Sequence, residues 1–146
     1  MSDLDKSIAQ ITESYQSAVY ARDVAALMRL YDPHVRVFDT WGVWLYEGAE
    51  AWQRAIEGWF TSLGTERVKV TFGELQVTSG RDMAIVSAIV HYAGLSAQGE
   101  PLRAMHNRIS WGLKLSGHVW RIVHEHTSAP VGFEDMKAIL QRAGGS

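Results

Sequence analysis

The stretch that decides the fold lies near the end of the chain and reads Trp-Arg-Ile-Val-His-Glu-His-Thr-Ser-Ala-Pro from Trp120 to Pro130. Its residues alternate as in a β-strand, whose successive side chains point to opposite faces of a sheet. One predicted face carries Trp120, Ile122, His124 and His126, and the other carries Arg121, Val123, Glu125 and Thr127. Two imidazoles on a face with a tryptophan and an isoleucine indicate either the lining of a cavity or a hydrogen-bonded site inside a core.

The composition is that of an ordinary globular domain. A chain of 146 residues, 47% hydrophobic and 21% charged, can bury a core without disulfides. We expect one domain over residues 1–146, with a core at about 4–131 and a tail at 132–146 that is partly helical or flexible. A net charge of −2 argues against a nucleic-acid partner. The polar N-terminus and the lack of a long apolar run argue against a membrane partner, so we expect a cytoplasmic protein.

Helical periodicity comes first along the chain and strand alternation follows. Apolar residues at steps of three and four predict helices at 4–21, from Asp23 to about residue 30, and at 49–63. Alternation predicts strands at 34–39, 67–78, 83–95, 102–115 and 118–127, with short turns between the last four. This order predicts an α+β fold in which the helices cover one face of a sheet that is antiparallel in its second half.

The last predicted hairpin has Ser116-Gly117 as its two-residue loop, which sets Leu115 opposite His118. His126 then lies opposite Asn107, so the inner face becomes polar at one end of the strand. On the outer face this register pairs Glu125 with Arg108 as a cross-strand ion pair. An inner face that is apolar at one end and polar at the other favours a cone with an open mouth.

The order of these elements, with the motif at 120–130, resembles the NTF2-like superfamily over about residues 4–131. Within it the chain is most similar to the SnoaL-like group and to the association domain of calcium/calmodulin-dependent kinase. The resemblance implies an NTF2-like cone, with three N-terminal helices packed on a strongly curved mixed or antiparallel sheet. It also implies a deep pocket between sheet and helices, and a homodimer through the outer face of the sheet.

The first half is also similar to ketosteroid isomerase, a member of the same superfamily. Tyr15 stands eight residues before Asp23, and Val37-Phe38-Asp39-Thr40-Trp41-Gly42 matches the strand that ends in the general base of that enzyme. The resemblance implies that Asp39 is a base and that Tyr15 stabilises an oxyanion. It places Ile122, His124 and His126 in the pocket wall. The third catalytic position falls near Asn107 or Ile109, where this chain has no carboxylate.

Four residues are our candidate catalytic groups: Tyr15, Asp39, His124 and His126. In an apolar cavity the pKa of the Asp39 carboxyl would rise toward the range of a general base, although a capping aspartate fits the same position. Tyr15 is either an oxyanion donor or a core tyrosine. The histidines fit acid, base, donor or metal-ligand roles, or a satisfied core pair. A metal would also need Asp39 or Asn107, and we expect neither a metal nor a cofactor.

Aromatic and apolar residues complete the predicted pocket. We expect its wall to be formed by Tyr31, Trp41, Trp44, Trp59, Phe60, Val90, Asn107, Ile109 and Ile122. Such a wall favours a small, flat, apolar ligand or one that bears a carboxylate.

Three functions fit the sequence, and the fold alone does not choose between them. The first is a cofactor-independent isomerase, cyclase or lyase that transfers a proton next to a carbonyl group. The second is a pocket that binds a small molecule without catalysis. The third is an oligomerisation module like the kinase association domain.

Overall fold

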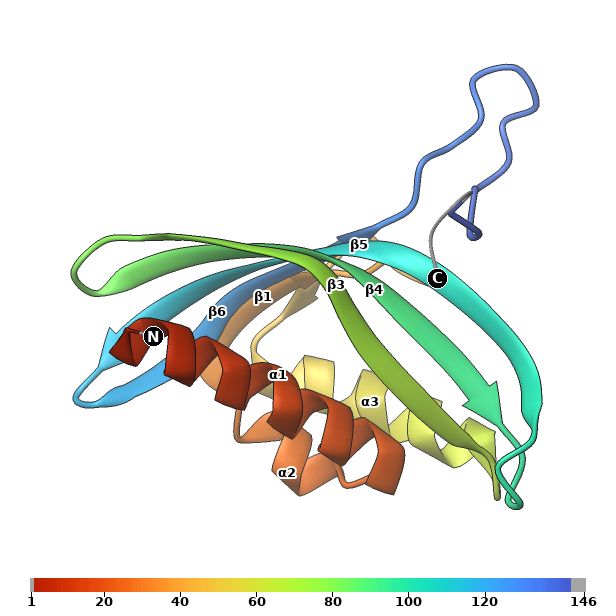
Figure 1. Cartoon of the computed structure of the whole chain (residues 1–146), viewed down its shortest axis with the longest axis horizontal. Helices are drawn as coiled ribbons and strands as arrows, with labels where there is room; N and C mark the ends of the chain where they lie inside the picture. The colour runs from red at the N-terminus through yellow and green to blue at the C-terminus, as the bar shows by residue number, and fades with distance from the viewer. Residues whose placement is uncertain (1, 143–146) are drawn as a thin grey trace.

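The computed structural model describes residues 2–142 and has the expected α+β architecture. Its elements in chain order are α1 (Asp3–Ala21), α2 (Val24–Met28), β1 (Tyr31–Phe38), β2 (Tyr46–Glu47), α3 (Ala49–Leu63), β3 (Arg67–Ser79), β4 (Met83–Leu95), β5 (Pro101–Ser116) and β6 (Val119–Ser128). The strands form one sheet in the order β2-β1-β6-β5-β4-β3, in which β1 and β6 are parallel and all other neighbours antiparallel. Figure 1 shows this curved, open sheet with the three helices on its concave side, so the predicted cone is confirmed.

Local sequence signals account for the helices. Ser2 caps α1 by accepting a hydrogen bond from the backbone of Asp5, whose side chain accepts one from Ser2 in return. Asp23 caps α2 at the start of the second predicted helix, and Gly64 ends α3 with a positive φ of 60°. The apolar stripe of α1 packs on β3, and that of α3 packs on β1. The two helices therefore hold their buried aromatic residues over the concave face of the sheet.

A bulge in β3 helps to bend the sheet. The register between β3 and β4 shifts between Gly73 and Gln76, and Glu74 has a φ of 52°. A bulge bends its strand and increases the local twist. In Figure 1 the strands β3, β4 and β5 curve toward the helices, which makes the concave side deep enough to enclose a cavity.

A second bulge, in β6, overturns the predicted faces of the C-terminal strand. Leu113 pairs with Ile122 and Gly112 pairs with His124, so Val123 is an extra residue without a partner on β5. An extra residue reverses the inside–outside alternation for everything that follows it. Glu125 is therefore buried on the inner face, and the predicted ion pair between Glu125 and Arg108 is wrong.

The turn between β5 and β6 also differs from the prediction. Ser116 pairs with Val119, and the two loop residues are Gly117 and His118 rather than Ser116 and Gly117. Gly117 has a φ of 63°, which is typical of a two-residue hairpin turn. Glycine takes this conformation without steric cost, so Gly117 occupies the first loop position and the loop lies one residue later than predicted.

The tail from Val131 to Arg142 is not helical, so the predicted helical character is wrong there. It forms a loop closed by an isolated bridge between Val131 and Ala138, and Figure 1 shows it projecting from the sheet. Its end returns to β5, where the amide of His106 donates to the carbonyl of Leu140 at 2.7 Å. It thereby covers part of the β5 edge beyond the end of β6. The rest of the predicted tail, residues 143–146, lies outside the described residues.

No helix within residues 2–142 combines the length and the apolar character that a membrane span requires. The single-domain limits, the cytoplasmic location and the homodimer through the outer face of the sheet stay predictions.

Candidate functional site

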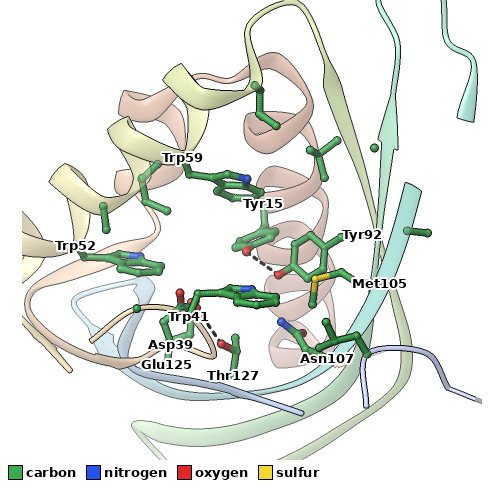
Figure 2. Close-up of a pocket in the computed structure, with 18 of the residues that line it drawn as sticks. Tyr15, Asp39, Trp41, Trp52, Trp59, Tyr92, Met105, Asn107, Glu125 and Thr127 are labelled. Carbon is green, nitrogen blue, oxygen red and sulfur yellow. Dashed lines mark hydrogen bonds between the residues drawn. The ribbon is translucent and has the colours of Figure 1, made fainter. Parts of the chain in front are cut away.

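A cavity of about 670 Å³ lies between the concave face of the sheet and the helices. Its wall combines carboxyl groups, tyrosine hydroxyls, an amide and indole rings, many of which are labelled in Figure 2. The labelled residues are Tyr15 from α1, Asp39 and Trp41 after β1, Trp52 and Trp59 from α3, Tyr92 from β4, Met105 and Asn107 from β5, and Glu125 and Thr127 from β6. The cavity therefore brings polar groups from five elements and one loop to a single site.

Asp39 follows the last residue of β1 and is held by Thr127. The hydroxyl of Thr127 donates to Oδ1 of Asp39 at 2.9 Å and accepts from the amide and the hydroxyl of Thr40 at 2.8 and 2.9 Å. The hydroxyl of Thr127 has one proton to donate. Because both donors of Thr40 point at its oxygen, this proton is donated to Asp39. Burial raises the pKa of the Asp39 carboxyl, and the hydrogen bond from Thr127 opposes that rise.

Glu125 provides a second carboxyl group, deeper in the cavity and only 1% exposed. Its Oε1 accepts from the hydroxyl of Tyr31 at 2.6 Å and from the indole Nε1 of Trp111 at 3.0 Å. Burial raises the pKa of Glu125 to about 7, the hydrogen bonds from Tyr31 and Trp111 lower it, and the charge of Asp39 raises it. The site thus contains two carboxyl groups in different environments, which is the arrangement that separates an acid from a base.

Two tyrosine hydroxyls form a pair in the same cavity. The hydroxyls of Tyr15 and Tyr92 lie 3.1 Å apart, close enough for one to donate to the other. Burial raises the pKa of both phenols, so both stay protonated at neutral pH. The pair uses one of its two protons internally, and the other can be donated to a molecule in the cavity.

Indole rings form much of the apolar wall. Trp41, Trp52 and Trp59 all line the cavity, and Trp41, which is 52% exposed, lies at its mouth. Two buried polar atoms of lining residues, Nε1 of Trp52 and Oδ1 of Asn107, have no hydrogen-bond partner among the described residues. Unpartnered buried groups are uncommon in native proteins, and a bound molecule is one means of satisfying them.

The structure brings together five of the residues that the sequence suggested for the site: Tyr15, Asp39, Trp41, Trp59 and Asn107. Four others lie in the core and do not line the cavity: Phe60, Val90, Ile109 and Ile122. Tyr31 lies behind the wall, where it donates to Glu125. Trp44 is 94% exposed and belongs to a shallower outer hollow.

The two histidines face away from the cavity, so the predicted placement of His124 and His126 is wrong. Nδ1 of His124 donates to the carbonyl of Arg36 at 2.7 Å. Both imidazoles pack edge-on against Phe38, with ring centroids 5.0 and 5.4 Å away. His126 lines the outer hollow with Trp44. Within residues 2–142 no three histidine, aspartate or glutamate side chains are grouped to hold a metal ion.

Strict alternation along the strand hid two residues that line the cavity, Glu125 and Thr127, because it placed them on the outer face. A signal of the bulge is nevertheless present in the sequence. Gly112 interrupts the predicted strand 102–115, and an isolated glycine in a strand often marks a bulge or a close backbone approach. In the structure a Cβ on Gly112 would lie 3.6 Å from Cβ of His124 and 3.7 Å from Cγ2 of Val123.

Solved structures with a similar fold share little sequence with this chain. An NTF2-like protein of unknown function from Pseudomonas putida KT2440 has a TM-score of 0.84 at 24% identity, with 97% of this chain and 98% of that chain covered. A candidate calcium/calmodulin dependent protein kinase II association domain from Xanthomonas campestris has a TM-score of 0.71 at 16% identity, with 84% and 85% covered. A nuclear transport factor 2 superfamily protein from Salmonella enterica serovar Typhimurium has a TM-score of 0.71 at 16% identity, with 89% and 94% covered.

These identities support the fold alone. The search of curated proteins found no matching sequence. The family comparison is more specific, because the model of the SnoaL-like domain matches residues 8–132, which is most of the chain. The resemblance read from the motif at 120–130 is thereby confirmed, and the chain belongs to the SnoaL-like domain family.

Proposed function

We propose that this protein binds a small, flat, largely apolar molecule in its cavity and transfers a proton at a carbon next to a carbonyl group. The observation that carries the proposal is the carboxyl group of Asp39, which lines the cavity and is oriented by the hydroxyl of Thr127 at 2.9 Å. A buried carboxylate with a raised pKa is a stronger base than one in water, and a fixed orientation keeps its lone pairs directed at one point.

The proposed reaction uses groups that line the cavity. Asp39 takes a proton from the carbon next to the carbonyl, and the electrons of that C–H bond form a C=C bond while a pair moves onto the oxygen. A hydroxyl of the Tyr15–Tyr92 pair donates a hydrogen bond to this oxygen as its charge develops. When the substrate is a β,γ-unsaturated ketone, the intermediate is a dienolate. Asp39 then returns the proton to its γ carbon while the electron pair on the oxygen re-forms the C=O bond, so the product is an isomer of the substrate and the carboxylate is regenerated.

The aromatic wall supports a flat ligand. Trp41, Trp52 and Trp59 offer ring faces and edges to a planar molecule, and a volume of about 670 Å³ is within the range of small-molecule sites. The proposal gives no part to His124 and His126, which lie on the other side of the sheet.

The test compares turnover of a panel of enones by the wild type and by Asp39→Asn, which keeps the size of the side chain but removes the base. We expect a loss of about 10²–10⁴-fold, as for removal of a general base. Asp82→Asn is the matched control, because Asp82 is exposed and lies in the loop before β4. Equal turnover by all three proteins would contradict the proposal.

A second function, ligand binding without chemistry, is favoured by the unpartnered Nε1 of Trp52 and Oδ1 of Asn107 in the cavity wall. It predicts that flat aromatic compounds raise the thermal midpoint while no enone is turned over. If no compound in such a screen binds, the remaining function is that of an oligomerisation module, which sedimentation of the protein would test.

A further inference from the structure

Glu125 is a buried carboxyl group that the proposed reaction does not use. None of the salt bridges among residues 2–142 includes it, although carboxylates that are buried are usually paired with a cation. The titratable groups that face it are Tyr15, Tyr31, Tyr92 and Asp39, which are neutral or acidic. Arg103 also lines the cavity, but its guanidinium is bonded to Glu66 at 2.5 Å.

The hydrogen bonds of Glu125 indicate which oxygen carries a proton. Both donors, the hydroxyl of Tyr31 and the indole of Trp111, lie on Oε1. The indole N–H can only donate, so a proton on Oε1 would compete with it, whereas a proton on Oε2 is compatible with both bonds. Among the described residues Oε2 has no hydrogen-bond partner, and Glu125 lines the cavity.

The nearby carboxyl of Asp39 also favours the protonated state of Glu125. Two carboxylates that share one low-dielectric cavity resist simultaneous ionisation, so one of them keeps its proton. Asp39 accepts a hydrogen bond from Thr127, which stabilises its charge, while Glu125 is almost completely buried. Asp39 is therefore the group that ionises first, and Glu125 keeps the proton.

We infer that Glu125 selects the ligand, because its Oε2–H presents a hydrogen-bond donor to a neutral oxygen acceptor such as a ketone carbonyl, while the charge of Asp39 excludes carboxylates. The inference rests on the ligand cavity of the proposed function and narrows its ligand to a neutral one. It also replaces the carboxylate-bearing ligand that the sequence left open. Ketone binding should weaken when Glu125 ionises, since the donor is then lost.

Two probes with the same ring system test this inference by calorimetry: acetylnaphthalene, a neutral ketone, and naphthoate, a carboxylate. For the wild type we expect the ketone to bind about tenfold or more weakly at about pH 8.5 than at about pH 5.5, because the competent, protonated fraction falls. Naphthoate should bind more weakly than the ketone at about pH 5.5. Equal binding of both probes, pH-independent ketone binding, or no binding at about pH 5.5 would overturn the inference.

Glu125→Gln is the matched variant, because its amide oxygen can accept from Tyr31 and Trp111 while its NH₂ group donates into the cavity. We expect it to bind the ketone equally at both pH values. The protonation state of Glu125 is also measured without a ligand, by carbon-13 NMR of the glutamate carboxyl groups. The signal of Glu125 is assigned as the one that is missing in Glu125→Gln. A carboxylate signal for Glu125 at about pH 5.5 would overturn the inference. Turnover is not a readout here, so a failure of proton transfer alone leaves ligand selection by Glu125 standing.

Discussion

A single hydroxyl proton links Thr127 to the proposed base. Because the hydroxyl of Thr127 accepts two hydrogen bonds from Thr40, its own proton is directed at Oδ1 of Asp39. Burial raises the pKa of the Asp39 carboxyl, and this hydrogen bond lowers it. Thr127 is therefore a positioning residue, which orients Asp39 and sets its basicity but is given no contact with the reacting atoms.

The substitution Thr127→Val keeps the shape of the side chain and removes this donor. We expect the pKa of Asp39 to rise further, since a hydrogen bond that stabilises the carboxylate is lost. The acid limb of the pH–rate profile should move to higher pH, and carbon-13 NMR of the aspartate carboxyls should show the same shift. The amide and the hydroxyl of Thr40 lose their acceptor, which should lower the free energy of unfolding by about 1–3 kcal/mol.

Thr78→Val is the control for this substitution, because Thr78 is an exposed threonine in β3, also in a strand. It should leave the titration of Asp39 unchanged. An unshifted Asp39 in Thr127→Val would show that the hydroxyl of Thr127 does not tune the carboxyl.

At the scale of elements, the bulge at Val123 explains why the residues of the site depart from the alternation predicted for β6. The helices, the hairpin order and the position of Asp39 follow from periodicity, capping residues and turn residues, and these local signals are strong in this chain. The inward placement of Glu125 departs from strict alternation because β6 holds one unpaired residue, opposite a glycine in a different strand. Such a tertiary feature cannot be deduced from alternation along one strand, which explains why the histidines and not Glu125 were predicted to line the cavity.

Deletion of Val123 tests this account of β6. Because Val123 is the extra residue, its deletion restores regular pairing and leaves both Glu125 and Thr127 on the inner face. We expect a folded protein that is destabilised by about 1–3 kcal/mol, as for many single changes, and that still binds acetylnaphthalene. Circular dichroism, urea unfolding and calorimetry measure these outcomes.

Deletion of Ser110 is the matched control, since Ser110 is an exposed residue in a regularly paired part of β5. Because β5 has no unpaired residue at this point, the deletion shifts the register of the strand by one residue. Buried side chains such as Trp111 then turn toward solvent. We expect this variant not to fold. Equal damage by both deletions would show that Val123 is not a dispensable bulge residue.

At the scale of the whole molecule, a site built from buried carboxyl groups should lower the stability of the fold as pH rises. The free energy of unfolding decreases with pH wherever the native state binds more protons than the unfolded chain. The pKa of Glu125 is about 7 in the fold against 4.5 for an ordinary glutamate, so the native state binds more protons between these values. Burial raises the pKa of Asp39 as well, which acts in the same direction.

Urea unfolding of the wild type and of Glu125→Gln over this pH range isolates the contribution of Glu125. The difference between a pKa of about 7 in the fold and 4.5 in the unfolded chain corresponds to about 3 kcal/mol of unfolding free energy, at 1.36 kcal/mol for each pKa unit. We therefore expect the wild type to lose about 3 kcal/mol relative to Glu125→Gln as pH rises through this range, and the difference to stay constant above it. The lowered pKa of His91 acts in the opposite direction, but His91 is present in both proteins and its effect cancels. Parallel stability curves would mean that the pKa of Glu125 is the same in the fold as in the unfolded chain, contrary to the protonated acid proposed for the cavity.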